Sequence, residues 1–584
     1  MTSCQSTAIC CLIIISLLKF VVSGRSYICN ENHHCVKGTG EFEYKTQNEC
    51  RLSCGSYGSL WPQPTGGIML SPKRVYFDPA NVRFNLVAPS AKTQQYLSDN
   101  SRLFKKNILK ECPKNACAWD GREQIFVKVS VNSDDMTFDW NTNESYNLTI
   151  DSTNVTVYVD VRAHSIYGAR LGLETLSQLI TGNQKSGLVT VASGRISDAP
   201  VFKHRGLLLD TARNFIPIRN IRKTLDAMSA SKMNILHWHA TDSQSFPIEI
   251  SKLPHLQRLG AYSSEMKYSK SDIEDIIKYA RLRGIRVLIE FDGPAHVGNG
   301  WQFASRAGLG DLVVCLNAQP WRKFCIQPPC GQFNPINENL YPTLKHLFDD
   351  IADMIPLEET IHMGGDEVFI PCWNATNEIL DYLKLNGLSR TEESFYRLWS
   401  DYHKNNLDIW DEIKSKKRLN DQQPVIVWSS HLTYPDVIEK YFPKNRYIIQ
   451  TWVGADLPLN TELLQKGYRI IVSTKDAWYL DHGFWGQTTY YNWKRVYQNQ
   501  IPRDSGVLGG EVCMWSEFVD EQTLDGRIWP RAGAAAERLW SDPRVLESDL
   551  EPRFLRYRQR LITRGVDPDA VVPKYCELNE GECF

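Results

Sequence analysis

Two adjacent carboxylates, Asp366 and Glu367, follow two glycines in the segment HMGGDEVF. A carboxylic acid can protonate the leaving oxygen of a glycosidic bond, and a carboxylate can stabilise the positive charge that develops on the sugar. Neighbours on a regular strand point to opposite faces, so these two groups cannot flank the bond independently at about 5 Å or more. Gly364 and Gly365 permit a bend that turns both side chains into one pocket. We therefore expect one to act as the acid and the other to steer a substrate group beside the reacting carbon.

Polar and aromatic side chains follow eight apolar runs, which begin near residues 205, 233, 285, 360, 424, 447, 469 and 506 and alternate with helical stretches. Eight such runs predict an α/β fold, a (β/α)8 TIM barrel, with an open doubly wound sheet as the alternative. Active sites of such barrels lie on the loops that follow the strands. These loops carry Asp210, Arg213, His237, His239, Asp242, Asp292, His296, Asp366, Glu367, Trp428, Trp452, Tyr479, Asp481, Trp515 and Glu517. We expect these residues to share one pocket.

The segment HWHATD offers a second kind of chemistry. His237 and His239 stand at positions i and i+2 and so share one face of a strand, where they could ligate a metal ion. The alternative interpretation is that they orient nearby carboxylates or pack between strands. We favour this alternative.

Composition excludes some classes of function. The 584 residues carry 66 Lys and Arg against 67 Asp and Glu, so no strong field exists to attract nucleic acid or anionic lipid. The hydrophobic fraction of 42% and the charged fraction of 23% are those of an ordinary globular protein. The 17 Trp and 25 Tyr are typical of sites that hold flat, partly apolar ligands such as sugars, although core packing explains them equally well.

The N-terminus resembles a secretory signal. The apolar run of residues 10–22 precedes Ser23 and Gly24, which predicts a removable signal peptide over residues 1–24. A signal anchor is the alternative, but the run is shorter than the roughly 20 apolar residues of a membrane span and contains Lys19. We expect a secreted, extracellular protein that is not in the membrane after signal removal, with a lysosomal destination left open. Sequons stand at Asn143, Asn147, Asn154 and Asn374.

The cysteine pattern fits an oxidising compartment. Three of the 16 cysteines lie in the signal segment, which leaves 13 in the mature chain and one thiol over. The predicted local pairs are Cys112/Cys117, Cys325/Cys330 and Cys576/Cys583, with Cys315/Cys372 closing a longer loop. Cys29, Cys35, Cys50 and Cys54 form a compact cluster, for which disulfides are favoured over zinc. Cys513 is expected to be a buried free thiol.

Changes of pattern along the chain predict four parts. These are the signal at 1–24, a Cys-rich segment at 25–60, a small α+β domain at 61–200 and the (β/α)8 domain at 201–584. The Cys-rich segment is interpreted as a structural staple, with a small chitin-binding module or partner-contact patch as the alternative.

Several motifs together resemble the family 20 β-N-acetylhexosaminidases. HMGGDEVFIPCW is similar to the signature of that family, and the resemblance extends to RGLLLDTARNF, HWHATDSQSFP, FDGPAHVGNGW, WYLD and GGEVCMWSE. It covers about residues 60–584. AHVGNGW and CIQPPCGQFNP look most like the insect chitinolytic branch.

The resemblance implies a role for each site residue. Glu367 would be the general acid/base with a raised pKa, while Asp366 and Tyr479 would hold the substrate's 2-acetamido group as it attacks the anomeric carbon. The pocket walls would be Trp428, Trp452 and Trp515. The groups that fix sugar hydroxyls would be Arg213, Asp481 and Glu517. Asp242 and His296 would support the catalytic pair, and no metal or organic cofactor is implied.

A second sugar is gripped in chitin-active relatives by a Trp and by a Glu in the loop after the third strand. Trp493 is the candidate for the Trp, and Gln327 stands where the Glu is expected. Loss of the charge-assisted bond would weaken the grip by about 1 kcal/mol. We therefore expect the second sugar of a chito-oligosaccharide to be bound more weakly than in those relatives.

The resemblance thus implies an exo-acting β-N-acetylhexosaminidase. Its partners would be chito-oligosaccharides or N-acetylhexosamine-terminated glycans, from which it would release terminal non-reducing N-acetylglucosamine, and also N-acetylgalactosamine, by retaining, substrate-assisted hydrolysis. The alternatives are a hexosaminidase directed mainly at N-glycans and a sugar-binding protein that has lost catalysis. The intact Asp366, Glu367 and Tyr479 argue against lost catalysis. A homodimer is usual in the family.

Overall fold

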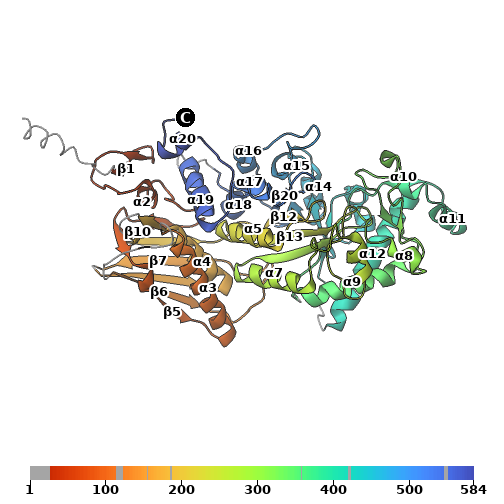
Figure 1. The fold of residues 1–584 in the computed structure, drawn as a ribbon, viewed down its shortest axis with the longest axis horizontal. Helices are drawn as coiled ribbons and strands as arrows, with labels where there is room; N and C mark the ends of the chain where they lie inside the picture. Colours follow the sequence, from red (N-terminus) through yellow and green to blue (C-terminus); the bar gives the residue numbers. More distant parts are fainter. Residues whose placement is uncertain are drawn as a thin grey trace, which may run out of the picture.

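The computed structural model describes residues 26–112, 117, 123–153, 155–183, 187–356, 358–417, 423–544 and 550–583. The predicted signal segment and the sequon at Asn154 lie outside the described residues. Two N-terminal sheets lie at one end of the molecule, and the parallel strands with their surrounding helices extend to the other end (Figure 1).

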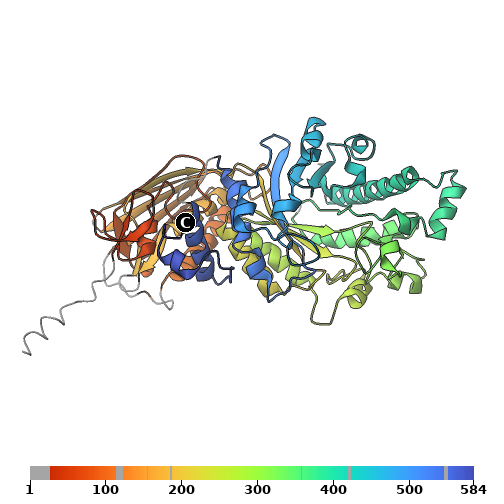
Figure 2. The ribbon, with the colours of Figure 1, turned by 90° about the horizontal axis from the view of Figure 1, so that it is seen from above.

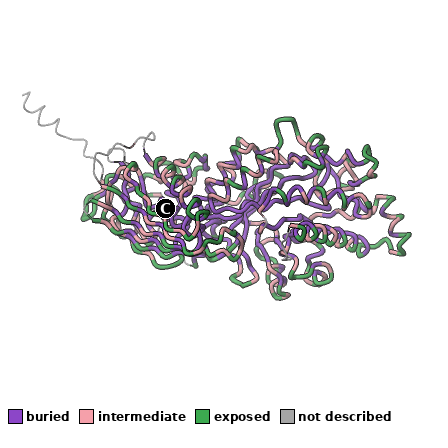
Figure 3. The backbone as a smooth tube through the Cα atoms, turned by 90° about the horizontal axis from the view of Figure 1, so that it is seen from below, coloured by how far each residue is buried: buried purple, intermediate pink, exposed green. Residues whose placement is uncertain are grey.

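Seven parallel strands form a sheet in the order β14-β13-β12-β20-β19-β18-β17. They are β12 (His204–Asp210), β13 (Ile235–Thr241), β14 (Arg286–Phe291), β17 (Val425–Trp428), β18 (Tyr447–Thr451), β19 (Arg469–Val472) and β20 (Val507–Met514). Except for Arg469, every residue in these strands is buried, as expected for a parallel sheet covered on its outer face (Figure 3).

Residues 361–363 close this sheet into a barrel. His362 forms parallel bridges to Glu290 of β14 and to Ile426 of β17. Its N–H donates to the Ile289 carbonyl at 3.1 Å, and the Met363 N–H donates to the Ile426 carbonyl at 2.9 Å. The predicted (β/α)8 barrel is therefore confirmed, and the open-sheet alternative is wrong.

Helices cover the outside of the barrel (Figure 2). The main ones are α5 (Ile218–Ala230), α7 (Lys270–Leu282), α9 (Leu340–Met354), α12 (Glu392–Lys416), α14 (Leu459–Gln465) and α18 (Arg531–Ser541). Helix α7 begins at a capping box, in which Ser269 and Asp272 satisfy each other's backbone N–H groups. Its buried residues Ile273, Ile276, Ile277 and Ala280 recur at helical spacing. No helix in the described ranges is both long and apolar enough to cross a membrane.

The N-terminal part contains a six-stranded sheet in the order β3-β11-β7-β8-β6-β5. Its strands are β3 (Ile68–Leu70), β5 (Val82–Val87), β6 (Gln124–Val131), β7 (Tyr146–Ser152), β8 (Thr156–Ala163) and β11 (Gly194–Asp198). A smaller sheet joins β4 (Arg74–Phe77), β9 (Ile180–Asn183) and β10 (Gly187–Val191). Helices α3 (Ala91–Leu109) and α4 (Ile166–Gln178) pack on the larger sheet. This is the predicted α+β arrangement.

Helix α4 joins the N-terminal sheet to the barrel. All 13 of its residues are buried. On the barrel side, Arg170 donates to the Ser229 carbonyl at 2.7 Å and Gln178 donates to the Ala230 carbonyl at 3.3 Å. The sheet therefore packs on the barrel through a fully covered helix. The domain boundaries drawn at residues 60 and 200 stay a prediction.

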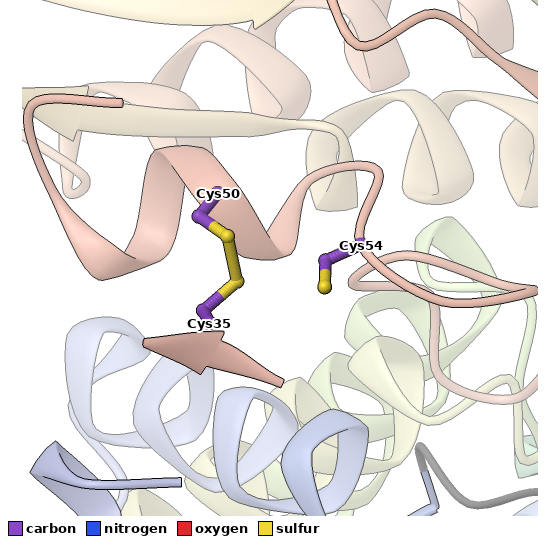
Figure 4. Close-up of side chains that lie close together, drawn as sticks. All are labelled: Cys35, Cys50 and Cys54. Carbon is purple, nitrogen blue, oxygen red and sulfur yellow. A yellow bond between two sulfur atoms is a disulfide. The ribbon is translucent and has the colours of Figure 1, made fainter. Parts of the chain in front are cut away.

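The Cys-rich segment contains β1 (Tyr27–Cys29), β2 (Cys35–Lys37) and α2 (Gln47–Arg51). Disulfides join Cys29 to Cys54 and Cys35 to Cys50, and Figure 4 shows the second of them beside Cys54. Although Cys35, Cys50 and Cys54 lie within ligating distance of one another, their sulfurs are committed to disulfides, so the zinc alternative is wrong.

The Cys-rich segment packs against the C-terminal tail. Helices α19 (Leu550–Arg564) and α20 (Lys574–Leu578) lie beside it (Figure 1). Glu580 accepts from the Cys35 N–H at 2.7 Å, and it forms a buried ion pair with Arg51. The two ends of the described chain therefore support each other.

The predicted cysteine pairs are present. Disulfides join Cys112 to Cys117, Cys325 to Cys330, Cys576 to Cys583 and Cys315 to Cys372. Cys513 is the free cysteine of the described residues, and it is buried in β20.

Candidate active site

The two adjacent carboxylates lie on a sharply bent loop after residues 361–363. Gly364, Gly365 and Glu367 have φ values of 57°, 106° and 49°. A Cβ on Gly364 would lie 1.8 Å from Asp292 Oδ1, so only glycine fits there. That oxygen of Asp292 accepts from the Gly365 N–H at 3.0 Å and thereby holds the bend. The predicted bend is present, and both carboxylates line one cavity.

This cavity has a volume of about 280 Å³ at the carboxyl ends of the strands. Among the site residues expected from the sequence, it is lined by Arg213, His296, Gln327, Asp366, Glu367, Trp452, Tyr479, Asp481, Trp515 and Glu517. Asp292 also lines it. The barrel therefore brings together side chains that are up to 304 positions apart in the chain, from Arg213 to Glu517.

A chain of charged groups leads to Glu367. Arg213 Nη2 lies 2.9 Å from Asp242 Oδ2, and the other oxygen of Asp242 lies 3.4 Å from His296 Nδ1. His296 Nε2 in turn lies 3.3 Å from Glu367 Oε2. Asp242 is buried and does not line the cavity, so its contact with substrate would pass through His296. Asp242 and His296 therefore lie in one line of contacts with Glu367, and their supporting role stays a prediction.

The charges of these neighbouring groups explain how His296 and Asp242 are ionised. Burial alone lowers the pKa of His296, but the Asp242 carboxylate outweighs it and raises that pKa well above the ordinary value. Burial raises the pKa of Asp242, but Arg213 and His296 outweigh it and lower that pKa. At neutral pH, a protonated His296 therefore lies between the carboxylates of Asp242 and Glu367.

The pKa of Glu367 differs from the expectation. Burial raises this pKa, but the hydrogen bond and charge of His296, with the charges of Arg213 and Lys475, lower it below the ordinary value. The expected raised pKa of Glu367 is therefore wrong for the free pocket, because the sequence did not show that a protonated imidazole faces this carboxylate.

The pKa of Asp366 is shifted in the opposite direction to that of Glu367. Burial, followed by the charge of Asp292, raises the pKa of Asp366 well above its ordinary value. Burial also raises the pKa of Asp292, to about 6. Asp366 Oδ1 is buried without a hydrogen-bond partner within the described chain. Such an oxygen is costly unless a ligand pairs with it, so it is available to accept a hydrogen bond from a ligand.

Two further carboxylates face the cavity with unpaired oxygens. Asp481 Oδ1 and Glu517 Oε2 are buried and have no partner among the residues that the structure describes. The other oxygen of Asp481 accepts from Trp485 Nε1 at 2.9 Å. Burial raises the pKa of Asp481 to about 7. Both free oxygens can accept hydrogen bonds from ligand hydroxyls.

Two expected tryptophans lie elsewhere. Trp428 is buried below the cavity, where its Nε1 donates to Glu290 Oε1 at 2.6 Å, so it supports the wall without lining it. Trp493 begins α16 (Trp493–Gln498) and stacks on Phe554 with ring centroids 4.4 Å apart. Its assignment to a second-sugar position is therefore corrected: its ring packs into the core, because α16 turns it toward α19.

Six lining residues were not foreseen from the sequence. They are Trp321, Ile326, Pro328, Lys475, His482 and Trp485. Trp485 lies four residues after Asp481, in the same strand-following loop, and that position was the available signal. Trp321 comes from the long excursion after β14, and no pattern in the sequence tied it to the pocket.

The histidines of HWHATD form a buried network beneath the cavity. His239 Nδ1 lies 2.5 Å from Glu290 Oε2, and its Nε2 lies 3.1 Å from Asp242 Oδ2. His239, Asp242 and Asp292 are close enough to hold a metal ion. Both nitrogens of His239 are nevertheless paired with carboxylates, which is the orienting role favoured from the sequence.

The chain is similar to known proteins over nearly its whole length. The family model described as "Glycosyl hydrolase family 20, catalytic domain" matches residues 202–543, and that described as "beta-acetyl hexosaminidase like" matches residues 60–179. The chitooligosaccharidolytic beta-N-acetylglucosaminidase of Bombyx mori is 40% identical over 577 residues, which cover 95% of this chain and 94% of that protein. The beta-hexosaminidase subunit beta of Homo sapiens is 34% identical and covers 78% of this chain and 77% of its own.

Solved structures share the fold. The chitobiase of Flavobacterium johnsoniae aligns with a TM-score of 0.68 and 24% identity over 87% of this chain and 73% of its own. The beta-N-acetylhexosaminidase of Streptomyces coelicolor aligns with a TM-score of 0.64 and 19% identity over 88% of this chain and 98% of its own.

Proposed function

This chain belongs to glycosyl hydrolase family 20 and is a β-N-acetylhexosaminidase, and we propose that the bent Asp366–Glu367 pair carries its substrate-assisted mechanism. The observation that supports this most is that both carboxylates reach one cavity, while only Glu367 contacts the protonated His296. The two groups therefore differ in charge and can take different roles.

In this mechanism Glu367 supplies and recovers one proton. It donates a proton to the glycosidic oxygen as the bond to the anomeric carbon breaks, and the leaving group departs as a neutral alcohol. In the free pocket this proton is on His296, whose Nε2 lies 3.3 Å from Glu367 Oε2, and it moves to Glu367 when substrate fills the pocket. In the second half, Glu367 removes a proton from the attacking water, and that proton passes back to His296.

Asp366 would act on the nucleophile. The substrate's acetamide oxygen forms a bond to the anomeric carbon as the glycosidic bond breaks, which gives an oxazolinium ring. Asp366 Oδ1, buried and unpaired, can accept a hydrogen bond from the acetamide N–H and so orient the acetamide oxygen toward the anomeric carbon. Water then opens the ring, and two inversions retain the configuration. Tyr479 lines the same cavity and can donate to the acetamide oxygen.

The remaining polar groups suit the hydroxyls of one terminal sugar. Asp481, Glu517 and Arg213 converge on the cavity, and Trp515 and Trp452 provide apolar walls. A cavity of about 280 Å³ suits a single sugar, which supports removal of terminal non-reducing residues. N-acetylglucosamine and N-acetylgalactosamine are both candidates for that terminal sugar.

The insect relatives suggest chitin oligomers as substrates, and the vertebrate relatives leave glycans as a second candidate. A sugar-binding protein without catalysis is not favoured, because the whole charged chain from Arg213 to Glu367 is in place. Secretion is supported by six disulfides among the described residues. Occupied sequons and a homodimer belong to the same proposal.

Two variants test the division of roles. Glu367→Gln should lower kcat about 100-fold or more on chitobiose but far less on a nitrophenyl glycoside, whose leaving group needs little protonation. Asp366→Asn should lower both rates alike, because it acts on the nucleophile. Equal losses on both substrates for Glu367→Gln would contradict the acid role.

A further inference from the structure

The six-stranded N-terminal sheet has one open face. Along β6, β7 and β8, buried side chains alternate with side chains that are exposed or partly exposed. The buried set faces helices α3 and α4, which lie on one side of the sheet (Figure 1). The other set lines an open cavity of about 580 Å³, which shares no residue with the cavity that contains Glu367.

A glycosylation sequon lies inside this open cavity. Asn147, Leu148 and Thr149 are consecutive on β7, and because side chains alternate along a strand, Asn147 and Thr149 share the open face while Leu148 is buried. Asn147 is exposed, and its neighbours on the adjacent strands, Arg162 of β8 and Ser197 of β11, are exposed as well. A glycan attached to Asn147 therefore has room above the sheet.

The floor of the open cavity contains an oxygen that lacks a partner. Asp160 Oδ1 is buried and makes no hydrogen bond within the described residues, whereas Asp160 Oδ2 accepts from Arg162 Nε at 2.7 Å. Asp160 stands opposite Thr149, two residues along β7 from Asn147. A buried acceptor of this kind is costly unless a donor reaches it. The hydroxyls of a sugar and the N–H of N-acetylglucosamine are such donors.

Two aromatic rings lie at the other end of the open cavity. Tyr158 is 51% exposed and Phe126 is 37% exposed, and their ring centroids are 6.4 Å apart. Tyr158 stands opposite Asp151, which is four residues along β7 from Asn147, or about 13 Å at the rise of a strand. A short chain of sugars that starts at Asn147 can therefore pass over the sheet and reach both rings, whose faces suit the apolar faces of sugars.

The charges and the volume of the open cavity favour sugars over an ionic partner. Arg162 pairs with Asp160, and Arg195 pairs with Asp151 at 3.3 Å, so four of the five charged side chains in the lining are already matched. The volume of about 580 Å³ is about twice that of the cavity of about 280 Å³ that suits one sugar. The open cavity therefore suits the pair of N-acetylglucosamine units with which an N-linked glycan begins.

We propose that Asn147 is N-glycosylated and that the first sugars of its glycan lie on the open face, over Asp160 and against Tyr158 and Phe126. This inference rests on the secretion that belongs to the proposed function, because only a chain that enters the secretory route receives such a glycan. The donor is an oligosaccharide joined to a lipid diphosphate. Asn147 Nδ2 forms a bond to its anomeric carbon, the bond from that carbon to the diphosphate breaks, and one amide proton leaves with the diphosphate.

The test compares two substitutions of Thr149 in the full chain, secreted by cultured animal cells. Thr149→Ser keeps the sequon, whereas Thr149→Val keeps the branched shape of the side chain and removes the sequon. Fragment masses that distinguish Asn147 from Asn143 and Asn154 should show a glycan on Asn147 in wild type and Thr149→Ser, and an unmodified Asn147 in Thr149→Val. An unmodified Asn147 in the secreted wild-type protein would overturn the inference.

Hydroxyl-radical labelling of the folded proteins tests where the glycan lies. Because the sugars cover the ring, oxidation of Tyr158 should be about threefold slower in Thr149→Ser than in Thr149→Val, while Tyr262, which is 48% exposed outside this cavity, should be oxidised equally in both. Removal of glycans from the folded wild type by a peptide N-glycosidase should raise the oxidation of Tyr158 to the Thr149→Val rate. Equal oxidation of Tyr158 with and without the glycan would overturn its placement on the sheet.

Hydrolysis of a nitrophenyl N-acetylglucosaminide separates this inference from the proposed function. Both Thr149 variants should keep kcat/KM within about twofold of wild type, because the open face shares no residue with the cavity that contains Glu367. A wild type that is glycosylated at Asn147 and shielded at Tyr158 but inactive would overturn the proposed activity alone. An active enzyme with an unmodified Asn147 would overturn this inference alone.

Discussion

The side-chain amide of Gln327 donates to Glu517 Oε1 at 3.0 Å, and its carbonyl oxygen accepts from Arg213 Nη2 at 3.1 Å. The neutral amide of Gln327 therefore bridges the Arg213 cation and the Glu517 carboxylate in the wall of the cavity that contains Glu367. Sequence comparison alone presented Gln327 as a lost charge. In the structure, a glutamine suits this position because its amide can accept from Arg213 and donate to Glu517.

Replacing Gln327 with Glu should weaken the site. The new carboxylate would face Glu517 at hydrogen-bond distance, and like charges at that separation repel. We expect Gln327→Glu to raise KM for chitobiose about tenfold, as measured by initial rates at low salt. Gln327→Met removes both hydrogen bonds without adding charge and should have the smaller effect. Tighter binding of chito-oligosaccharides by Gln327→Glu would show that the bridge is unimportant.

The bend before the catalytic pair should not tolerate a side chain. Gly364→Ala would place a methyl group against Asp292 at a φ of 57°, so we expect activity to fall at least 100-fold together with lower thermal stability. Gly387→Ala is the matched control, because it also has a positive φ, of 65°, but its Cβ would meet open space. A fully active Gly364→Ala enzyme would contradict the tight contact with Asp292.

The raised pKa of Asp292 should make the folded protein less stable at neutral pH than at acid pH. Its pKa is raised from 3.8 to about 6, so the native state binds the proton more tightly than the unfolded state. The contribution of Asp292 to stability therefore falls as pH rises from about 4 to 6. The difference of about two pKa units corresponds to about 3 kcal/mol.

Asp292→Asn should remove this loss of unfolding free energy, because the side chain no longer ionises. We expect urea unfolding to give a variant that is more stable than wild type by about 2 kcal/mol at pH 7.5 and by almost nothing at pH 4. Activity should nevertheless fall, because the negative charge beside Asp366 is gone. The exposed Asp275→Asn serves as the control. A stability difference that does not depend on pH would argue against a raised pKa.

Substrate binding should depend on the ionisation of Asp481. Its pKa of about 7 means that it gains its negative charge as pH rises through neutrality. A carboxylate accepts a sugar hydroxyl more strongly than a carboxylic acid does. KM of wild type should therefore fall between pH 6 and 8, and in Asp481→Asn this part of the KM profile should be flat and higher. An unchanged slope in Asp481→Asn would assign the titration to another group.

Substitutions of Trp485 and Trp493 should have different effects, the first on substrate binding and the second on stability. Trp485 lines the cavity and is 37% exposed, so Trp485→Ala should raise KM for oligomers with little change in the melting temperature. Trp493 is buried against Phe554, so Trp493→Ala should cost about 3 kcal/mol of unfolding free energy and leave KM of the folded enzyme near the wild-type value. The reverse pattern would restore Trp493 as a sugar platform.

The sequence by itself determined the barrel and most of its functional end. Apolar runs alternating with helical stretches require a covered parallel sheet, and side chains that follow parallel strands must meet at one end of it. Arg213, Tyr479 and Glu517 could therefore be assigned to one pocket although they lie far apart in the chain. The local cysteine pairs were predictable for the same reason, because close spacing leaves few partners.

Only the tertiary structure decided which side chain faces which. The pKa of Glu367 depends on His296 and Lys475, which approach it from other loops, and no local pattern contains those distances. The direction of the Trp493 ring depends on how α16 packs against α19, which is a property of the assembled core. Periodicity specifies elements and the ends at which they meet, whereas charge, burial and side-chain direction follow from contacts between distant segments.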